Sequence, residues 1–128
     1  MGLLVTGATG FVGQYAIKYL NEKFIVSTVS LRNTNVDQID FSGITQILHL
    51  AGKAHQMEPI SDDIYFEVNH RLTIELAKAP KAAGILHFVF VSSVKVYGDQ
   101  VKKELDENSA CNPTDPYGKV NWLLKIIC

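Results

Sequence analysis

The sequence predicts an α/β fold, a doubly wound parallel sheet, on three observations. A short apolar strand at residues 3–5 leads into a turn with glycines at positions 7, 10 and 13. Runs of β-branched and apolar residues follow at 24–31, 46–50 and 86–91. Between these runs, apolar residues recur every three or four positions, which is typical of helices. Strands that alternate with helices indicate a parallel sheet, and we expect the strand order 3-2-1-4-5.

Length and composition predict one globular domain without a polyanionic partner. The chain has 128 residues, 47% hydrophobic and 20% charged, and a net charge of −1, which suits a single packed core. Acids and bases are interspersed, so no nucleic-acid partner is expected. Its longest apolar run is too short for a bilayer, and the N-terminus lacks a basic signal region. Cys111 and Cys128 give little support for a disulfide, so we expect a cytoplasmic protein. We also expect no membrane partner and no metal site.

The elements can be placed from the same patterns. The first helix is expected over residues 11–21 and the second strand over 24–31. Too few residues separate that strand from the one at 46–50 for a full helical crossover, so a weak third strand is expected over 36–39. A long helix should begin at Pro59 and end around Pro80 and Gly84. Residues 94–116 form a long loop, and Pro116 begins a last helix that runs to Ile127.

The glycine turn is the strongest functional signal. Gly7 permits a tight turn after the strand, and Gly10 lets backbone N–H groups approach a pyrophosphate closely. Gly13 lets the helix pack closely on the sheet, with the phosphates at its positive N-terminus. The alternative is a strand–helix turn that is rich in glycine by chance. The position directly between a strand and a helix favours a dinucleotide site.

The end of the second strand leaves the type of dinucleotide open. Many NAD sites have an acid here that binds the ribose 2′-hydroxyl, but residues 30–33 contain none. Arg32 would stack on adenine or pair with a 2′-phosphate, which would favour NADP. The alternative for Arg32 is a solvated surface residue.

Four motifs together resemble one family. Thr6 with the Gly-x-x-Gly-x-x-Gly spacing is similar to the extended short-chain dehydrogenases/reductases, the NAD-dependent epimerase/dehydratase family. The stretch 47–52, Ile-Leu-His-Leu-Ala-Gly, resembles the family's His-x-Ala-Ala/Gly motif. Residues 92–98 resemble Ser-Ser-x-x-x-Tyr-Gly, and 115–119 resemble the catalytic Pro-Tyr-Gly region. The resemblance implies a Rossmann-type domain, NAD or NADP as cofactor and a nucleotide-sugar substrate, as in bacterial 4-epimerases of surface-polysaccharide synthesis.

The resemblance also implies roles for individual residues. Ser93 would bind the reacting hydroxyl and Tyr117 would be the acid/base. Asn69 would support the active site. The residues implied in cofactor binding are Gly7, Thr9, Gly10, Phe11, Val12, Gly13, Arg32, Asp40, Phe41, Leu50, Ala51, Gly52, Asn69 and Tyr117.

The chain departs from the family at two points. The lysine of Tyr-x-x-x-Lys, which holds the nicotinamide ribose and makes the tyrosine more acidic, is Asn121. Lys119 would face away from Tyr117 on a helix, and Lys125 lies two turns further on. The chain also stops inside the Tyr117 helix. We therefore expect residues 1–128 to be an incomplete NAD(P)-binding domain, truncated before the last strands, with no substrate domain.

Two functions remain open from the sequence. One is the NAD(P)-binding portion of a nucleotide-sugar epimerase/dehydratase, weakly active or inactive as this chain. The other is a non-catalytic NAD(P)-binding module that senses redox state or docks a partner. In either case, an unpaired strand at 86–91 and an apolar last helix predict a homo-oligomer or a companion chain.

Overall fold

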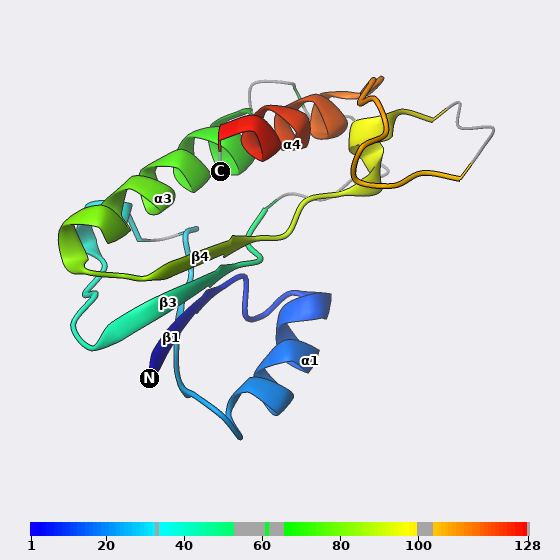
Figure 1. Cartoon of the computed structure of the whole chain (residues 1–128). Helices are drawn as coiled ribbons and strands as arrows, with labels where there is room; N and C mark the ends of the chain where they lie inside the picture. The colour runs from blue at the N-terminus through cyan, green and yellow to red at the C-terminus, as the bar shows by residue number, and fades with distance from the viewer. Residues whose placement is uncertain (33, 53–60, 62–65, 100–103, 128) are drawn as a thin grey trace. The chain divides into compact units, whose positions relative to one another are not determined.

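The computed structural model describes residues 1–32, 34–52, 61, 66–99 and 104–127 (Figure 1). They divide into two compact units. The first unit contains Met1–Gly52 and Leu72–Val91, and the second contains Lys53–Arg71 and Ser92–Cys128. Within the described part of the chain, no helix is long and apolar enough to cross a membrane.

The first unit is built on a four-stranded parallel sheet of order β2-β1-β3-β4. Its helices α1 and α3 lie on opposite faces of this sheet (Figure 1). The predicted doubly wound α/β fold is therefore confirmed. The elements are β1 (Gly2–Thr6), α1 (Phe11–Leu20), β2 (Ile25–Val29), β3 (Ile44–His49), α3 (Leu72–Ala83) and β4 (His87–Phe90).

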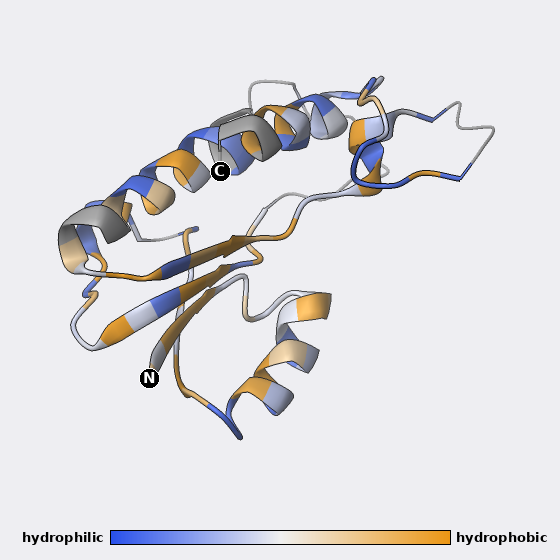
Figure 2. Cartoon of the chain, in the orientation of Figure 1, coloured by the Kyte–Doolittle hydropathy of each residue, from blue (hydrophilic) through white to orange (hydrophobic). Residues whose placement is uncertain are grey.

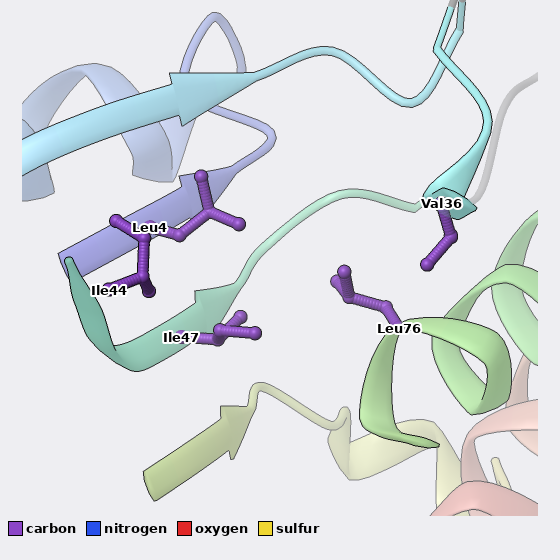
Figure 3. Packing of buried hydrophobic residues seen from close by; sticks show 5 residues of the cluster. All are labelled: Leu4, Val36, Ile44, Ile47 and Leu76. Carbon is purple, nitrogen blue, oxygen red and sulfur yellow. The ribbon is translucent and has the colours of Figure 1, made fainter. Parts of the chain in front are cut away.

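Apolar side chains from the sheet and α3 form the core of this unit. Leu4 of β1 and Ile47 of β3 are aligned neighbours in the sheet, and both are buried. Leu76 of α3 and Val36 point toward each other beside them (Figure 3). Each such side chain stabilises the fold by roughly 1.5–3 kcal/mol through burial. In Figure 2 the strands of this sheet carry hydrophobic residues interspersed with hydrophilic ones.

The predicted third strand is wrong. Residues 36–38 form a short 3₁₀ helix, Val36–Gln38. The backbone N–H of Asn35 donates to the side-chain oxygen of Gln38, and the N–H of Gln38 donates to the carbonyl of Asn35. These reciprocal bonds close a turn, and Val36 anchors it in the core, so no extended segment is left to pair.

The end predicted for the long helix, around Pro80 and Gly84, is confirmed at Gly84, whereas its predicted start cannot be compared. Pro59 lies outside the described residues, and the described part begins with a π-helical turn, η2 (Phe66–Arg71). The helix then continues through Pro80 as far as Ala83. Proline removes only one N–H bond from a helix, whereas Gly84 adopts a positive φ of 75° that ends it.

The second unit consists of short helical elements around one long helix. The 3₁₀ helix η3 (Val94–Tyr97) follows β4 in sequence, within the region predicted as a loop. The helix α4 spans Pro116–Ile127, as predicted, and packs against η2 and η3. Val120 and Leu124 of α4 are buried, with 5% and 0% exposure, so its inner face anchors this unit.

Candidate functional site

The glycine loop lies directly against the residues that follow β3. Gly7 has a φ of +72°, a conformation that glycine adopts without strain. A Cβ at this position would lie 2.6 Å from the backbone nitrogen of Ala51. The backbone N–H of Leu50 donates to the carbonyl of Thr6 over 3.2 Å. The structure therefore brings two sequence-predicted segments, the loop from Gly7 and the stretch 50–52, into contact.

The helix that follows the loop packs closely on it at Gly13 but is open at Gly10. A Cβ at Gly13 would lie 2.2 Å from the carbonyl oxygen of Gly7, so α1 packs on the loop as closely as glycine allows. A Cβ at Gly10 would meet one atom within 4 Å, the Gly7 oxygen at 3.2 Å. Gly10 also caps α1 without a side-chain hydrogen bond, and the first turn of α1 carries no acid. Such an N-terminus favours an anion.

The residues around this N-terminus are open to solvent. Thr9, Gly10, Phe11 and Val12 are all exposed. Phe11 is 81% exposed, and its ring makes an edge contact with Tyr15 on the next turn of α1. The apolar stripe predicted for α1 is therefore present but outward-facing. These residues leave the loop accessible to a ligand.

A chain of buried polar groups supports the loop from beneath. His49 at the end of β3 is 1% exposed. Its Nδ1 lies 2.6 Å from the hydroxyl of Thr6, and its Nε2 lies 2.7 Å from the hydroxyl of Thr73 on α3. Burial lowers the pKa of His49 to about 4, so the ring is neutral at pH 7. Sequence reasoning did not assign a role to Thr6 or Thr73. The signal in the sequence was that both are polar residues at positions where the strand and helix patterns predict buried side chains.

The residues predicted near the adenosine differ in their surroundings. Arg32, after β2, is exposed. Asp40 is exposed, and its hydrogen bonds with Ser42, first the side chain and then the backbone, hold its pKa below the ordinary value. Phe41 is half-buried and packs against the hydrophobic core of the first unit. Arg32 and Asp40 are therefore accessible to a ligand, and Phe41 also packs against the core while it stays partly exposed.

In the second unit, Ser93 and Tyr117 lie on elements that touch. Ser93 caps η3, where its Oγ accepts the backbone N–H of Lys95 over 3.2 Å. Tyr117 is in the first turn of α4. A Cβ at Gly118 would lie 2.5 Å from the carbonyl oxygen of Lys95, so η3 and α4 are in close backbone contact there. The two residues with implied catalytic roles are thus held by adjoining elements.

An ionic cluster fixes the start of α4. Lys95 Nζ lies 2.5 Å from Asp99 and 3.3 Å from Asp115. The pKa of Lys95 is raised, first by its hydrogen bond to Asp99 and then by that to Asp115. Asp115 also accepts the N–H of Gly118 over 2.6 Å and so caps α4. The loop that leads into Tyr117 is therefore tied to η3.

Two buried asparagines complete this unit. Asn121, where the family has lysine, is 3% exposed, and its amide nitrogen donates to the carbonyl of Tyr117 over 2.9 Å. Asn69 is 4% exposed on η2, which packs against α4. All four residues that the resemblance assigned to catalysis or its support in this region, Asn69, Ser93, Tyr117 and Asn121, thus belong to one unit.

Comparisons with known proteins identify relatives of this chain. UDP-glucose 4-epimerase of Vibrio cholerae is 32% identical over 91% of this chain and 42% of its own length. An Escherichia coli O157:H7 protein, N-acetyl-alpha-D-glucosaminyl-diphospho-ditrans,octacis-undecaprenol 4-epimerase, is 30% identical over 94% of this chain and 40% of its own. A short-chain dehydrogenase/reductase superfamily protein from Agrobacterium tumefaciens, crystallised with bound NAD, matches with a TM-score of 0.83 and 28% identity, over 99% of this chain and 44% of that chain. The chain spans less than half the length of these relatives.

The family model described as "NAD dependent epimerase/dehydratase family" matches residues 3–127. That match covers nearly the whole chain and includes the glycine loop, the residues after β3, Ser93 and Tyr117. The chain therefore belongs to the NAD-dependent epimerase/dehydratase family.

Proposed function

We propose that this chain is the NAD(P)-binding portion of a nucleotide-sugar epimerase or dehydratase that acts on a UDP-sugar. The observation that carries the proposal is the N-terminus of α1 at Gly10, which has no side-chain cap and lies in the glycine loop whose Gly7 packs against the backbone of Ala51. Relatives named UDP-glucose 4-epimerase and a neighbour crystallised with NAD support it.

The first unit would hold the cofactor. Backbone N–H groups in the first turn of α1, after Gly10, would bind the pyrophosphate, because no capping side chain accepts a hydrogen bond from them. Asp40 would accept hydrogen bonds from the ribose hydroxyls, whereas Arg32 would pair with a 2′-phosphate. Both NAD and NADP are therefore candidates. A bound nicotinamide would supply the hydride acceptor and donor.

The second unit would supply the proton-transfer groups. Tyr117 would take a proton from a sugar hydroxyl, and the Ser93 hydroxyl would orient that same hydroxyl. Asp115 would keep the first turn of α4 in place through its bond to Gly118. Asn121 brings no positive charge to Tyr117, so we expect proton transfer to be slow.

A second candidate follows from Asn121 alone. Its amide is buried and donates to the Tyr117 carbonyl, so it forms part of the fold of α4. That arrangement suits a non-catalytic NAD(P)-binding module, which senses redox state or docks a partner. This module would bind cofactor as described above but would not turn over a sugar.

A turnover assay separates the two candidates. The chain would be incubated with UDP-glucose and NAD, and UDP-galactose would be followed by proton NMR over hours. The epimerase proposal predicts slow product formation, below about 1 per second. Tyr117→Phe should remove it, whereas Lys119→Ala, at an exposed position two residues away, should not. Product that Tyr117→Phe does not reduce would contradict the role of Tyr117, and product that Tyr117→Phe removes would contradict the non-catalytic module.

A further inference from the structure

Three polar side chains are buried together beneath the glycine loop. Thr6 and Thr73 are both 0% exposed, and His49 between them is 1% exposed. The rings of Phe88 and Phe90 flank the His49 ring, with centroids 6.0 Å away in each case. Burying three polar groups among apolar ones is costly unless each is hydrogen-bonded. Here they bond to one another, from α3 through β3 to β1.

One placement of the protons allows every hydrogen bond among Thr6, His49 and Thr73 to form. The hydroxyl oxygen of Thr6 also accepts the backbone N–H of Ala51 over 3.2 Å. If the Thr6 hydroxyl donates to Nδ1 of His49, then Nε2 carries the ring proton and donates to Thr73. Thr6 then uses its donor and an acceptor site, and both ring nitrogens are paired. This assignment requires a neutral ring with its proton on Nε2.

At Thr6, this series of hydrogen bonds reaches the backbone of the glycine loop. Thr6 directly precedes Gly7, whose carbonyl accepts the N–H of Gly10 over 3.0 Å. Ala51, held by the Thr6 hydroxyl, is the residue against which Gly7 packs. The position of the Thr6 side chain therefore sets the spacing between the glycine loop and the stretch after β3.

We propose that Thr6, His49 and Thr73 act as positioning residues, a relay that transmits the placement of α3 to the glycine loop and fixes it for cofactor binding. The relay carries no proton in the reaction and touches no substrate. Its binding consequence rests on the proposed NAD(P) function, whereas its geometry is testable without any ligand.

The first test uses the unliganded chain and backbone amide NMR. Thr73→Val removes the hydroxyl from α3 and keeps the side-chain shape. The relay predicts that the Ala51 and Gly7 amide resonances move, although neither residue touches Thr73 in the hydrogen-bond chain. The matched control is Thr45→Val, on the same strand as His49, where the hydroxyl donates to the Gly2 carbonyl instead. It should leave the Ala51 and Gly7 resonances in place. If Thr73→Val leaves the Ala51 and Gly7 amide resonances unchanged, the relay is overturned.

The second test measures cofactor affinity by calorimetry. Thr6→Val should raise the Kd for NAD or NADP by about tenfold or more, since it removes the link to Ala51. Thr6→Ser keeps the hydroxyl and should restore the Kd to within about threefold of wild type. Thr45→Val should change it less than about twofold. Equal effects of Thr6→Val and Thr45→Val would contradict the positioning role. If wild type binds neither cofactor, the proposed function fails, while the amide test still decides the relay.

Discussion

The side-chain amide of Asn121 donates a hydrogen bond to the backbone carbonyl of Tyr117, one helical turn earlier on α4, over 2.9 Å. Asparagine competes for backbone groups in this way because its side chain is short. At the same position a lysine would extend a positive charge beyond the helix backbone. The fold of α4 is thus kept, while the positive charge that the family resemblance implies beside the tyrosine is absent at Asn121.

Asn121→Lys should tighten cofactor binding. A lysine here would offer an ammonium to the nicotinamide ribose, and a charged hydrogen bond of this kind changes affinity by about tenfold. Calorimetry with NAD and NADP measures the change. The control is Asn121→Leu, which also removes the bond to the Tyr117 carbonyl but adds no charge. An equal change in both variants would show that the charge is irrelevant.

Asp115→Ala should destabilise the start of α4. The carboxylate accepts the N–H of Gly118 and pairs with Lys95, so its loss removes a helix cap. We expect the free energy of unfolding to fall by about 1 kcal/mol in urea denaturation. Asp115→Asn keeps an acceptor and should recover most of the loss. A stability unchanged by Asp115→Ala would show that the cap contributes nothing.

His49 should make the protein less stable in acid. Its folded pKa of about 4 lies below the ordinary value of 6.5, so the unfolded state binds the proton more readily. Stability is therefore fully present above about pH 6.5 and is lost as the pH falls toward 4. The loss should reach about 3 kcal/mol at 1.36 kcal/mol per pH unit.

Urea denaturation at pH 7 and pH 4.5 checks this dependence. His49→Gln should flatten the difference between the two pH values, because glutamine takes up no proton. His87→Gln, at an exposed position on β4, should keep it. If wild type and His49→Gln lose the same stability in acid, the buried ring is not the source.

The sequence predicted the fold best where apolar periodicity decides the structure. β1, α1, β3 and α4 lie within a residue or two of their expected positions, because each carries a regular pattern of apolar residues in the sequence. The prediction of a strand over 36–39 was wrong because Asn35 and Gln38 close a turn, which the apolar periodicity does not reveal. The end of α3 was predicted around Pro80 and Gly84, and the helix passes Pro80 and ends just before Gly84.

The sequence predicted the motifs of the candidate site, but it did not predict the buried hydrogen bonds beneath the glycine loop. Glycine spacing and the Ala51–Gly52 turn are local patterns, and the structure brings them together. The link from Thr6 to His49 joins residues 43 positions apart, and the link from His49 to Thr73 joins residues 24 apart. Only the pairing of β1 with β3 and the packing of α3 reveal such contacts. Local patterns cannot show them.

The edge of the sheet at β4 should promote self-association. Among the described strands, β2 and β4 form the two edges, and Leu86 and Val89 are 73% and 51% exposed. Exposed apolar edges recruit other chains. Sedimentation should therefore show a dimer or larger assembly, and Val89→Lys should shift it toward monomer. Thr28→Lys on the opposite edge is the control. A wild-type monomer at all concentrations would contradict this expectation.

Calorimetric titration of the chain with NAD(H) and NADP(H) tests the central claim, that the glycine loop binds a dinucleotide. We predict binding of at least one cofactor in the micromolar range or weaker. Gly10→Ala, whose Cβ would meet protein only at the Gly7 oxygen, should preserve the fold and weaken binding by about tenfold or more. Ser27→Ala, at an exposed position on β2, should leave it unchanged. Absence of heat with every cofactor form at millimolar concentration, or equal affinity in Gly10→Ala and wild type, would contradict the account.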